Sequence, residues 1–225
     1  MTLITLVLLT LFVGLGRWQW HRGEAKQAVW SEYERNAAAS SIGTREFDSI
    51  DRFARLELNG EFEPDHQFLL DNRSHAGKPG YEVLTPFRLA DGRRVLVNRG
   101  WIPFGGYRDR LPDVAMSTVA PALISGRIDD LPSGGLASGH AAPDANAPWP
   151  RLTSFPTHAE LADSLGVKLE NRMLLLDAGV PGGYLREWSP PGMPPSRHFS
   201  YAIQWWGFAA VLLVLYFGLN FRKVS

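Results

Sequence analysis

The chain has 225 residues, of which 45% are hydrophobic, with 23 basic residues, 23 acidic residues and no cysteine. The lack of cysteine excludes disulfide scaffolds, thiolate zinc sites, cysteine copper sites and thiol catalysis. Three basic residues, Arg17, Arg222 and Lys223, lie near the ends, so the middle of the chain has a net charge of about −3. This composition argues against nucleic-acid binding, which requires a basic patch.

An apolar run opens the chain. Met1 to Gly16 carries no charge, and the run extends to Trp20 if the Arg17 side chain snorkels to the membrane interface. We predict a first transmembrane helix over residues 1–20. There is no basic segment before the run and no small-residue cleavage site after it, so we expect an uncleaved signal anchor rather than a removed signal peptide. The run begins so abruptly that a few further residues are expected before Met1.

Residues 21–197 are predicted to form one domain, which begins as a helix over Trp18–Ala39 continuing out of the membrane. Short segments with strand character follow, and Asp91-Gly92 predicts a hairpin between two of them. The predicted strands are Phe53–Asn59, Gln67–Asn72, Tyr81–Leu89, Arg93–Asn98, Ala122–Ile128 and Arg172–Asp177.

Other segments of the domain carry turn, loop and helix signals. Lys78-Pro79-Gly80 predicts a turn, and Asp130–Pro150 predicts a long, mobile loop. Pro156–Leu165 predicts a short helix ended by Gly166. Early and late helices around short antiparallel strands indicate a mainly antiparallel α+β domain, in the form of a small sandwich or an open barrel.

A second apolar segment closes the chain. Residues 199 to 221 are uncharged and would form roughly 34 Å of helix at 1.5 Å per residue, so we predict a second transmembrane helix over residues 198–221. Arg222 and Lys223 lie in the remaining tail, residues 222–225. The positive-inside rule places this tail in the cytoplasm. With two spans, both termini are then cytoplasmic and the central domain is extracytoplasmic.

His198 stands at the start of the second span. Helical spacing places His198, Tyr201, Ala202 and Trp205 on one face. An ionisable group at membrane depth is costly and marks a functional site by default, and a neutral imidazole is a good ligand for haem iron. The alternative is an interfacial belt of aromatic residues with an incidental histidine.

The first span ends in a similar mixture of residues. Trp18, His21 and Arg22 share a helix face, and small residues such as Gly16 allow two membrane helices to approach closely. Two such helices could hold a flat ligand between aromatic walls, with Arg22 and Arg197 pairing with its carboxylates. The alternative is that these arginines contact lipid headgroups.

The segment Val95–Pro103 predicts a strand ending in a tight turn. Arg99 and Trp101 are residue types enriched at binding hot spots and could recognise a partner; alternatively this is a core strand whose Gly100 serves the turn. The sequence contains no zinc-protease motif, phosphate-binding loop or nucleophile elbow. We therefore do not expect an enzyme.

Three blocks of sequence together resemble the surfeit-locus protein 1 family, which assists assembly of haem-copper cytochrome oxidase. They are Leu15–Arg22, Gly80–Phe87 continued through Asp91-Gly92 to Val97–Pro103, and His198–Trp206. The blocks occur in the order found in the family and span nearly the whole chain, although Asp130–Pro150 carries none of the resemblance. Just before the histidine, where the family often has an asparagine, this chain has Ser196-Arg197.

The resemblance implies a non-enzymatic assembly factor for an aa3-type oxidase. It implies that haem a is bound transiently, with His198 as the axial iron ligand and Tyr201, Trp205, Trp18 and Arg22 around the cofactor. The implied partners are oxidase subunit I, haem a synthase and the lipid bilayer.

No transit peptide is recognisable, which favours a bacterial inner-membrane protein with a periplasmic central domain. An alternative is a structural chaperone that holds nascent subunit I in the membrane without binding haem. In that case His198 would be a polar contact, and oxidase defects would follow changes at Arg99 or Trp101.

Overall fold

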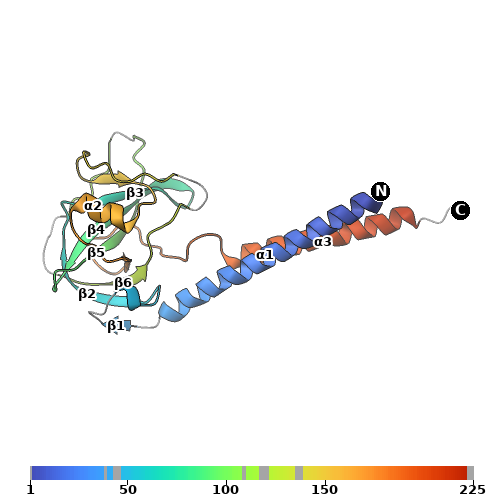
Figure 1. The fold of residues 1–225 in the computed structure, drawn as a ribbon, viewed down its shortest axis with the longest axis horizontal. Helices are drawn as coiled ribbons and strands as arrows, with labels where there is room; N and C mark the ends of the chain where they lie inside the picture. Colours follow the sequence, from blue (N-terminus) through green and yellow to red (C-terminus); the bar gives the residue numbers. More distant parts are fainter. Residues whose placement is uncertain are drawn as a thin grey trace. The chain divides into compact units, whose positions relative to one another are not determined.

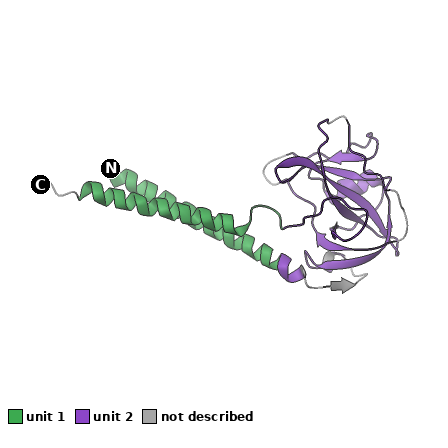
Figure 2. Ribbon diagram, turned by 180° about the vertical axis from the view of Figure 1, so that it is seen from behind, with its two compact units in different colours: residues 1–32, 190–225 green, residues 33–189 purple. Residues whose placement is uncertain are grey.

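The computed structural model describes residues 2–37, 40–42, 47–107, 110–116, 122–134 and 139–221. The chain divides into two compact units, one of residues 1–32 and 190–225 and the other of residues 33–189 (Figure 2). The predicted cytoplasmic tail, residues 222–225, lies outside the described residues.

The first unit consists mainly of two long helices, most of α1 (Thr2–Ala37) and α3 (Pro195–Asn220) (Figure 1). Both are long and apolar enough to cross a membrane. The apolar run and the polar helix predicted after it are one unbroken helix, α1. Pro195 opens α3, where its missing N–H costs nothing and its fixed φ angle suits the first turn.

The second unit is built around a closed β-barrel. The strands are β1 (Ser40–Ile42), β2 (Arg55–Phe62), β3 (Phe68–His75), β4 (Lys78–Leu89), β5 (Arg94–Pro103), β6 (Ala122–Asp129), β7 (Arg151–Thr153) and β8 (Met173–Leu176). Their order is β1-β2-β6-β8-β5-β4-β3-β7, and an additional pairing of β2 with β4 closes the ring. Most pairings are antiparallel, so the predicted fold class is confirmed, and the barrel is closed rather than open.

The long strand β4 makes this closure. Its first part pairs with β3 and its last part with β2, where Gly60 lies opposite Leu89. A side chain at residue 60 would collide with the carbonyl oxygen of Arg88 and the ring of Phe87. Glycine at this position therefore lets β2 approach β4 closely enough to form the ladder.

Apolar side chains fill the barrel and the layer beneath the short helix α2 (His158–Leu165). Leu161 of α2 is completely buried in a cluster that includes Phe68 and Leu96. The side chains of Thr157 and Glu160 cap the start of α2 reciprocally, and Gly166 ends it in the left-handed conformation. The helix predicted before Gly166 is therefore confirmed.

The turn predicted at Lys78-Pro79-Gly80 is wrong. The chain turns one step earlier, at Ala76 and Gly77, both of which have positive φ angles. Lys78 to Gly80 begin β4, where the carbonyl of Pro79 accepts a hydrogen bond of 3.0 Å from the amide of Phe104. Strand pairing outweighs the local turn preference of proline and glycine at this point.

Strand β5 also differs from its prediction, because it continues through Gly100 to Pro103 instead of turning. The register with β4 shifts between Glu82 and Leu84, and Gly100 has a φ of 113°. This is a β-bulge, which re-aims the side chains beside it. The three-residue strands β1 and β7 were not predicted because they are too short to show a periodic pattern.

The bulge lies beside Arg99, which is only 3% exposed. Its guanidinium donates to the carbonyl of Gly182 and to the side-chain oxygen of Gln67, both at 2.7 Å. Burial lowers its pKa. Arg99 is therefore a core residue, which favours the interpretation of Val95–Pro103 as a core strand over its recognition of a partner. Trp101 is half-buried and lies against Gly80.

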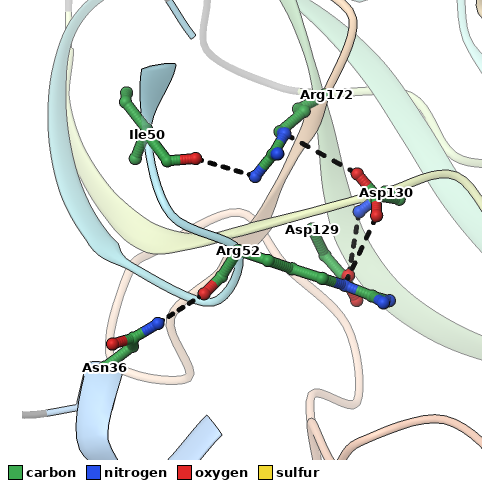
Figure 3. A network of polar contacts seen from close by, with 6 residues as sticks. All are labelled: Asn36, Ile50, Arg52, Asp129, Asp130 and Arg172. Atoms are coloured by element: carbon green, nitrogen blue, oxygen red, sulfur yellow. Dashed lines mark hydrogen bonds and ion pairs between the residues drawn. The ribbon is translucent and has the colours of Figure 1, made fainter. Parts of the chain in front are cut away.

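A polar network holds the last turn of α1, which belongs to the second unit, against the barrel (Figure 3). The side chain of Asn36 donates to the carbonyl of Arg52 at 2.7 Å, and the guanidinium of Arg52 pairs with Asp129 at 2.6 Å. Burial raises the pKa of Asp129, an effect that Arg52 opposes. Asp130 links the network to Arg172.

We predict that Gly60→Ala lowers the free energy of unfolding by about 1–3 kcal/mol, because the added methyl group overpacks the β2–β4 closure. The measurement is thermal unfolding of the full chain in mild detergent. Gly105→Ala is the matched control, since nothing lies within 4 Å of a Cβ atom there. Equal melting temperatures for the two variants would contradict the role given to Gly60.

Candidate ligand site between the apolar helices

Helices α1 and α3 pack antiparallel through glycines on one and large aromatic rings on the other. A Cβ atom at Gly16 would collide with the indole of Trp206, and one at Gly23 would meet the ring of Phe199. The two glycines are seven residues apart in α1, and the two aromatic residues are seven apart in α3, or about two helical turns in each case. Trp20 adds ring contacts at 4.9 Å to Phe199 and 5.6 Å to Trp206. These contacts fix the register of the two helices.

The other side of the same interface carries Phe12 and Gln19 on α1. The ring of Phe12 lies 5.8 Å from Trp205 and 5.9 Å from Phe208. About two helical turns further along α1, the side-chain oxygen of Gln19 lies 2.8 Å from Nδ1 of His198. A polar pair is thus embedded in an aromatic interface.

His198 is the fourth residue of α3 and retains only 9% of its surface exposed. An amide oxygen can only accept a hydrogen bond, so this contact requires the hydrogen on Nδ1; in the tautomer with its hydrogen there, Nε2 keeps its lone pair. Within the described parts of the chain, the hydrogen bond of the His198 ring is made by Nδ1 and none is made by Nε2. Nε2 is therefore the nitrogen of His198 that could bind a metal ion.

The other residues of α3 that were predicted to share a face with His198 differ in their exposure. Ala202 is completely buried against α1, Trp205 is half-buried, and Tyr201 is 42% exposed. Spacing of 100° per residue therefore puts Ala202 inside the interface and Tyr201 at its rim. The shared face predicted for these residues is split between the interface and its edge.

The predicted residues of α1 lie further from His198. Trp18 is 59% exposed and Arg22 is exposed, and neither contacts His198. Arg22 follows Gln19 by three residues and Trp18 by four, so the three residues occupy one flank of α1. The structure thus places Trp18 and Arg22 beside the Gln19 flank of the interface, without joining them to the histidine.

His21 points about 200° away from Gln19 around the helix, since the two residues are two apart in sequence. Its side chain is 62% exposed, and its Nδ1 lies 3.0 Å from a carboxylate oxygen of Glu24. Its Nε2 lies 3.4 Å from the Nε of Arg17. Both ring nitrogens of His21 are engaged at the surface, which makes His198 the stronger candidate ligand.

Gln19 was not predicted as a site residue, although a signal for it exists. It is a neutral polar residue in the first block, and it follows an apolar segment in which unsatisfied amides are costly. Nothing in the sequence shows which residue satisfies it. Only the helix register reveals that the partner is His198.

In the second unit, a hollow of about 530 Å³ lies beside the start of α2 and is lined by His140 and His158 among others. His140 contacts the carbonyl of Phe155 at 3.1 Å and Glu160 at 3.0 Å, while Nε2 of His158 is buried without a partner. Among the described residues no three metal-ligating side chains come together.

Taken together, the described residues form one unit with a small β-barrel and a second unit with two helices that are apolar enough for a membrane, in which Nε2 of His198 makes no hydrogen bond. The SURF1 family model matches residues 6–210, so the chain belongs to the SURF1 family and the predicted resemblance is confirmed. The SURF1 family is known generally as a family of oxidase assembly factors, not of enzymes.

Individual relatives agree with the family assignment. A SURF1-like protein of Rickettsia bellii is 28% identical over 95% of this chain and 87% of its own length. An uncharacterised SURF1-like protein of Mycobacterium bovis is 31% identical over 70% of this chain and 56% of its own. A SURF1-like protein of Rickettsia felis is 29% identical over 44% of this chain, and the alignment spans 45% of that relative.

We predict that Gly16→Ala loosens the helix pair, because its methyl group would occupy the position of the Trp206 indole. Gly14→Ala is the matched control two residues away, where nothing lies within 4 Å of a Cβ atom. We expect Gly16→Ala to lower the melting temperature in detergent and shift the tryptophan fluorescence, and Gly14→Ala to do neither. Identical behaviour of the two variants would contradict this helix register.

We also predict that His158 makes the protein sensitive to acid. Burial lowers its pKa below the ordinary value of 6.5, so the unfolded chain takes up the proton first. The stability that neutral His158 provides is therefore lost as pH falls below about 6.5. Melting temperatures at pH values of about 7.5 and 5.5 should differ less in His158→Leu than in the natural protein.

His140 provides the control of opposite sign. The carbonyl of Phe155, and then Glu160, raise the pKa of His140, so its contribution is present below about 6.5 and lost as pH rises through the raised value. His140→Gln should therefore lose stability at low pH and become more acid-sensitive. A smaller acid effect in His140→Gln than in His158→Leu would contradict both assignments.

Proposed function

We propose that this SURF1 family member binds haem a transiently and aids its insertion into subunit I of an aa3-type cytochrome oxidase. The observation that carries the proposal is the buried imidazole of His198, whose Nδ1 is engaged by Gln19 and whose Nε2 is unpartnered among the described residues. An imidazole nitrogen in this state is a suitable axial ligand for haem iron.

The residues around His198 fit a flat, amphiphilic ligand. Trp205 offers an aromatic surface on the same face of α3, about two helical turns from the histidine, and Tyr201 is exposed. Trp18 and Arg22 stand on the flank of α1 that carries Gln19, and the guanidinium of Arg22 is suited to pair with a carboxylate. Bound haem a supplies the redox-active iron that the oxidase requires, and these side chains would hold and orient it.

A single protein ligand also suits the release that the proposed role demands. A carrier must bind its cargo in one partner and give it up to another, so moderate affinity serves better than a closed two-ligand site. Subunit I is then the proposed acceptor and haem a synthase the proposed donor. The exposed apolar faces of α1 and α3 support placement in a lipid bilayer.

The proposed location is the bacterial inner membrane, with both termini cytoplasmic and the barrel domain periplasmic. Arg222 and Lys223, immediately after the second apolar segment, support this orientation by the positive-inside rule. A long central domain translocates regardless of its own charges, so its slight acidic excess does not oppose the arrangement.

We predict that His198→Ala abolishes haem a binding while the protein stays folded. The full chain is co-produced with the enzymes of haem a synthesis, purified in mild detergent and compared by reduced-minus-oxidised absorption spectra. The natural protein should show a haem a band that is missing from His198→Ala. His21→Ala is the matched control and should retain the band, because His21 is exposed and paired with Glu24.

Other results would redirect the proposal. Loss of the band in His21→Ala alone would transfer the ligand to that residue. The absence of a band in the natural protein would overturn haem carriage and favour the structural chaperone. That alternative draws support from the Gln19 bond itself, since His198 already has a polar role within the helix pair.

A further inference from the structure

We propose that Gln19 is a positioning residue for the iron ligand. In this inference, which rests on the proposed function, the amide oxygen of Gln19 fixes the ring of His198 with the hydrogen on Nδ1 and the lone pair on Nε2. Gln19 would not touch the iron. It would determine which nitrogen of His198 can bind the iron and how the ring is turned.

The geometry of the contact supports this role. The Gln19 oxygen lies 2.8 Å from Nδ1, which is short for a hydrogen bond donated by a ring nitrogen. Gln19 is half-buried and His198 is buried, so water competes little for either group. An unmade hydrogen bond at this place would be costly for both side chains.

The chemistry of the pair is directional. Histidines that bind metals commonly donate the hydrogen of their other ring nitrogen to an oxygen, which fixes the tautomer and raises the basicity of the ligating nitrogen. Gln19 supplies such an oxygen to His198. The opposite tautomer would leave the amide oxygen facing a bare Nδ1 and would place a hydrogen on Nε2, where it blocks ligation.

The surrounding packing holds the pair in place. Gly16 and Gly23 of α1 lie about one helical turn on either side of Gln19, and each is covered by an aromatic ring of α3. The register of the helices is therefore set by neighbours of Gln19 rather than by the hydrogen bond alone. This separates the two roles experimentally, because the bond can be removed while the glycine contacts remain.

A purely structural hydrogen bond between helices is the competing explanation. Such a bond would stabilise the helix pair in either tautomer, because the Gln19 amide could turn over and donate its NH2 to a bare Nδ1, and its loss would act through helix separation. Trp20→Phe serves as the packing control, since Trp20 contacts Phe199 and Trp206 but not His198. A variant that disturbs packing alone should leave the tautomer of His198 unchanged.

The first experiment needs no haem. Full-length protein with ¹⁵N-labelled histidine is prepared in detergent as the natural sequence, Gln19→Leu, Gln19→Glu and Trp20→Phe, and the tautomer of His198 is read by NMR. We expect the Nδ1–H tautomer in the natural protein and in Trp20→Phe, and a mixture of tautomers in Gln19→Leu. Gln19→Glu keeps an oxygen at the same position and should restore the single tautomer.

The second experiment uses the same variants co-produced with haem a. We expect Gln19→Leu to weaken haem a binding about 10–100-fold, the usual effect of removing such a partner, and Gln19→Glu to recover most of it. In the ferrous protein, the iron–histidine stretching frequency should be lower in Gln19→Leu and higher in Gln19→Glu. A merely structural partner would not move this frequency in opposite directions.

Two results would overturn the inference. One is an Nε2–H tautomer in the natural protein; the other is a tautomer and haem affinity that Gln19→Leu leaves unchanged. If the natural protein binds no haem a, the proposed function fails, and the haem-free NMR comparison still decides whether Gln19 fixes the ring of His198. The two failures are therefore distinguishable.

Discussion

The helix pair depends on the fit of two glycines to two large aromatic rings. Gly16 and Gly23 leave room on α1 for Trp206 and Phe199, and this fit sets the register of α1 against α3. Lipid offers no hydrophobic drive for helices to associate, so close packing and hydrogen bonding must hold them. The same register brings Gln19 to His198, so the chemistry of the proposed site follows from the packing on either side of it.

The barrel likewise depends on glycines at positions where the backbone has no room for a side chain. Gly60 lets β2 reach β4, and the bulge at Gly100 lies beside the buried guanidinium of Arg99. Arg99 then supplies donors to the carbonyl of Gly182 and the amide oxygen of Gln67, which ties a loop to the barrel. A buried cation with good acceptors is tolerated, but removing either side would leave an unsatisfied group.

The sequence predicts elements that have a residue pattern of their own, and it misses features that depend on which distant segments pair with each other. The role of His198 as an iron ligand stays a prediction. Both apolar helices, six strands and the α2 helix follow from periodicity and charge, and the family follows from the three sequence blocks. The closing of the barrel and the start of β4 at Lys78 do not, because strand pairing overrides the turn signal of Pro79-Gly80. Gln19 was not predicted as a site residue for a similar reason: its partner His198 is 179 positions away, and only the register of the two helices brings them together.

The burial of His198 bears directly on reversible binding. A histidine exposed at a membrane surface would exchange hydrogen bonds with water and would present either nitrogen. In the interface, Gln19 satisfies Nδ1, and the lone pair of Nε2 has no partner among the described residues. Nδ1 has thus already exchanged water for a protein partner before any ligand binds, so the ring needs less reorganisation when a ligand does bind. In the proposed function, the cofactor would bind through one nitrogen, and the ring would return to the same hydrogen-bonded state when the cofactor leaves.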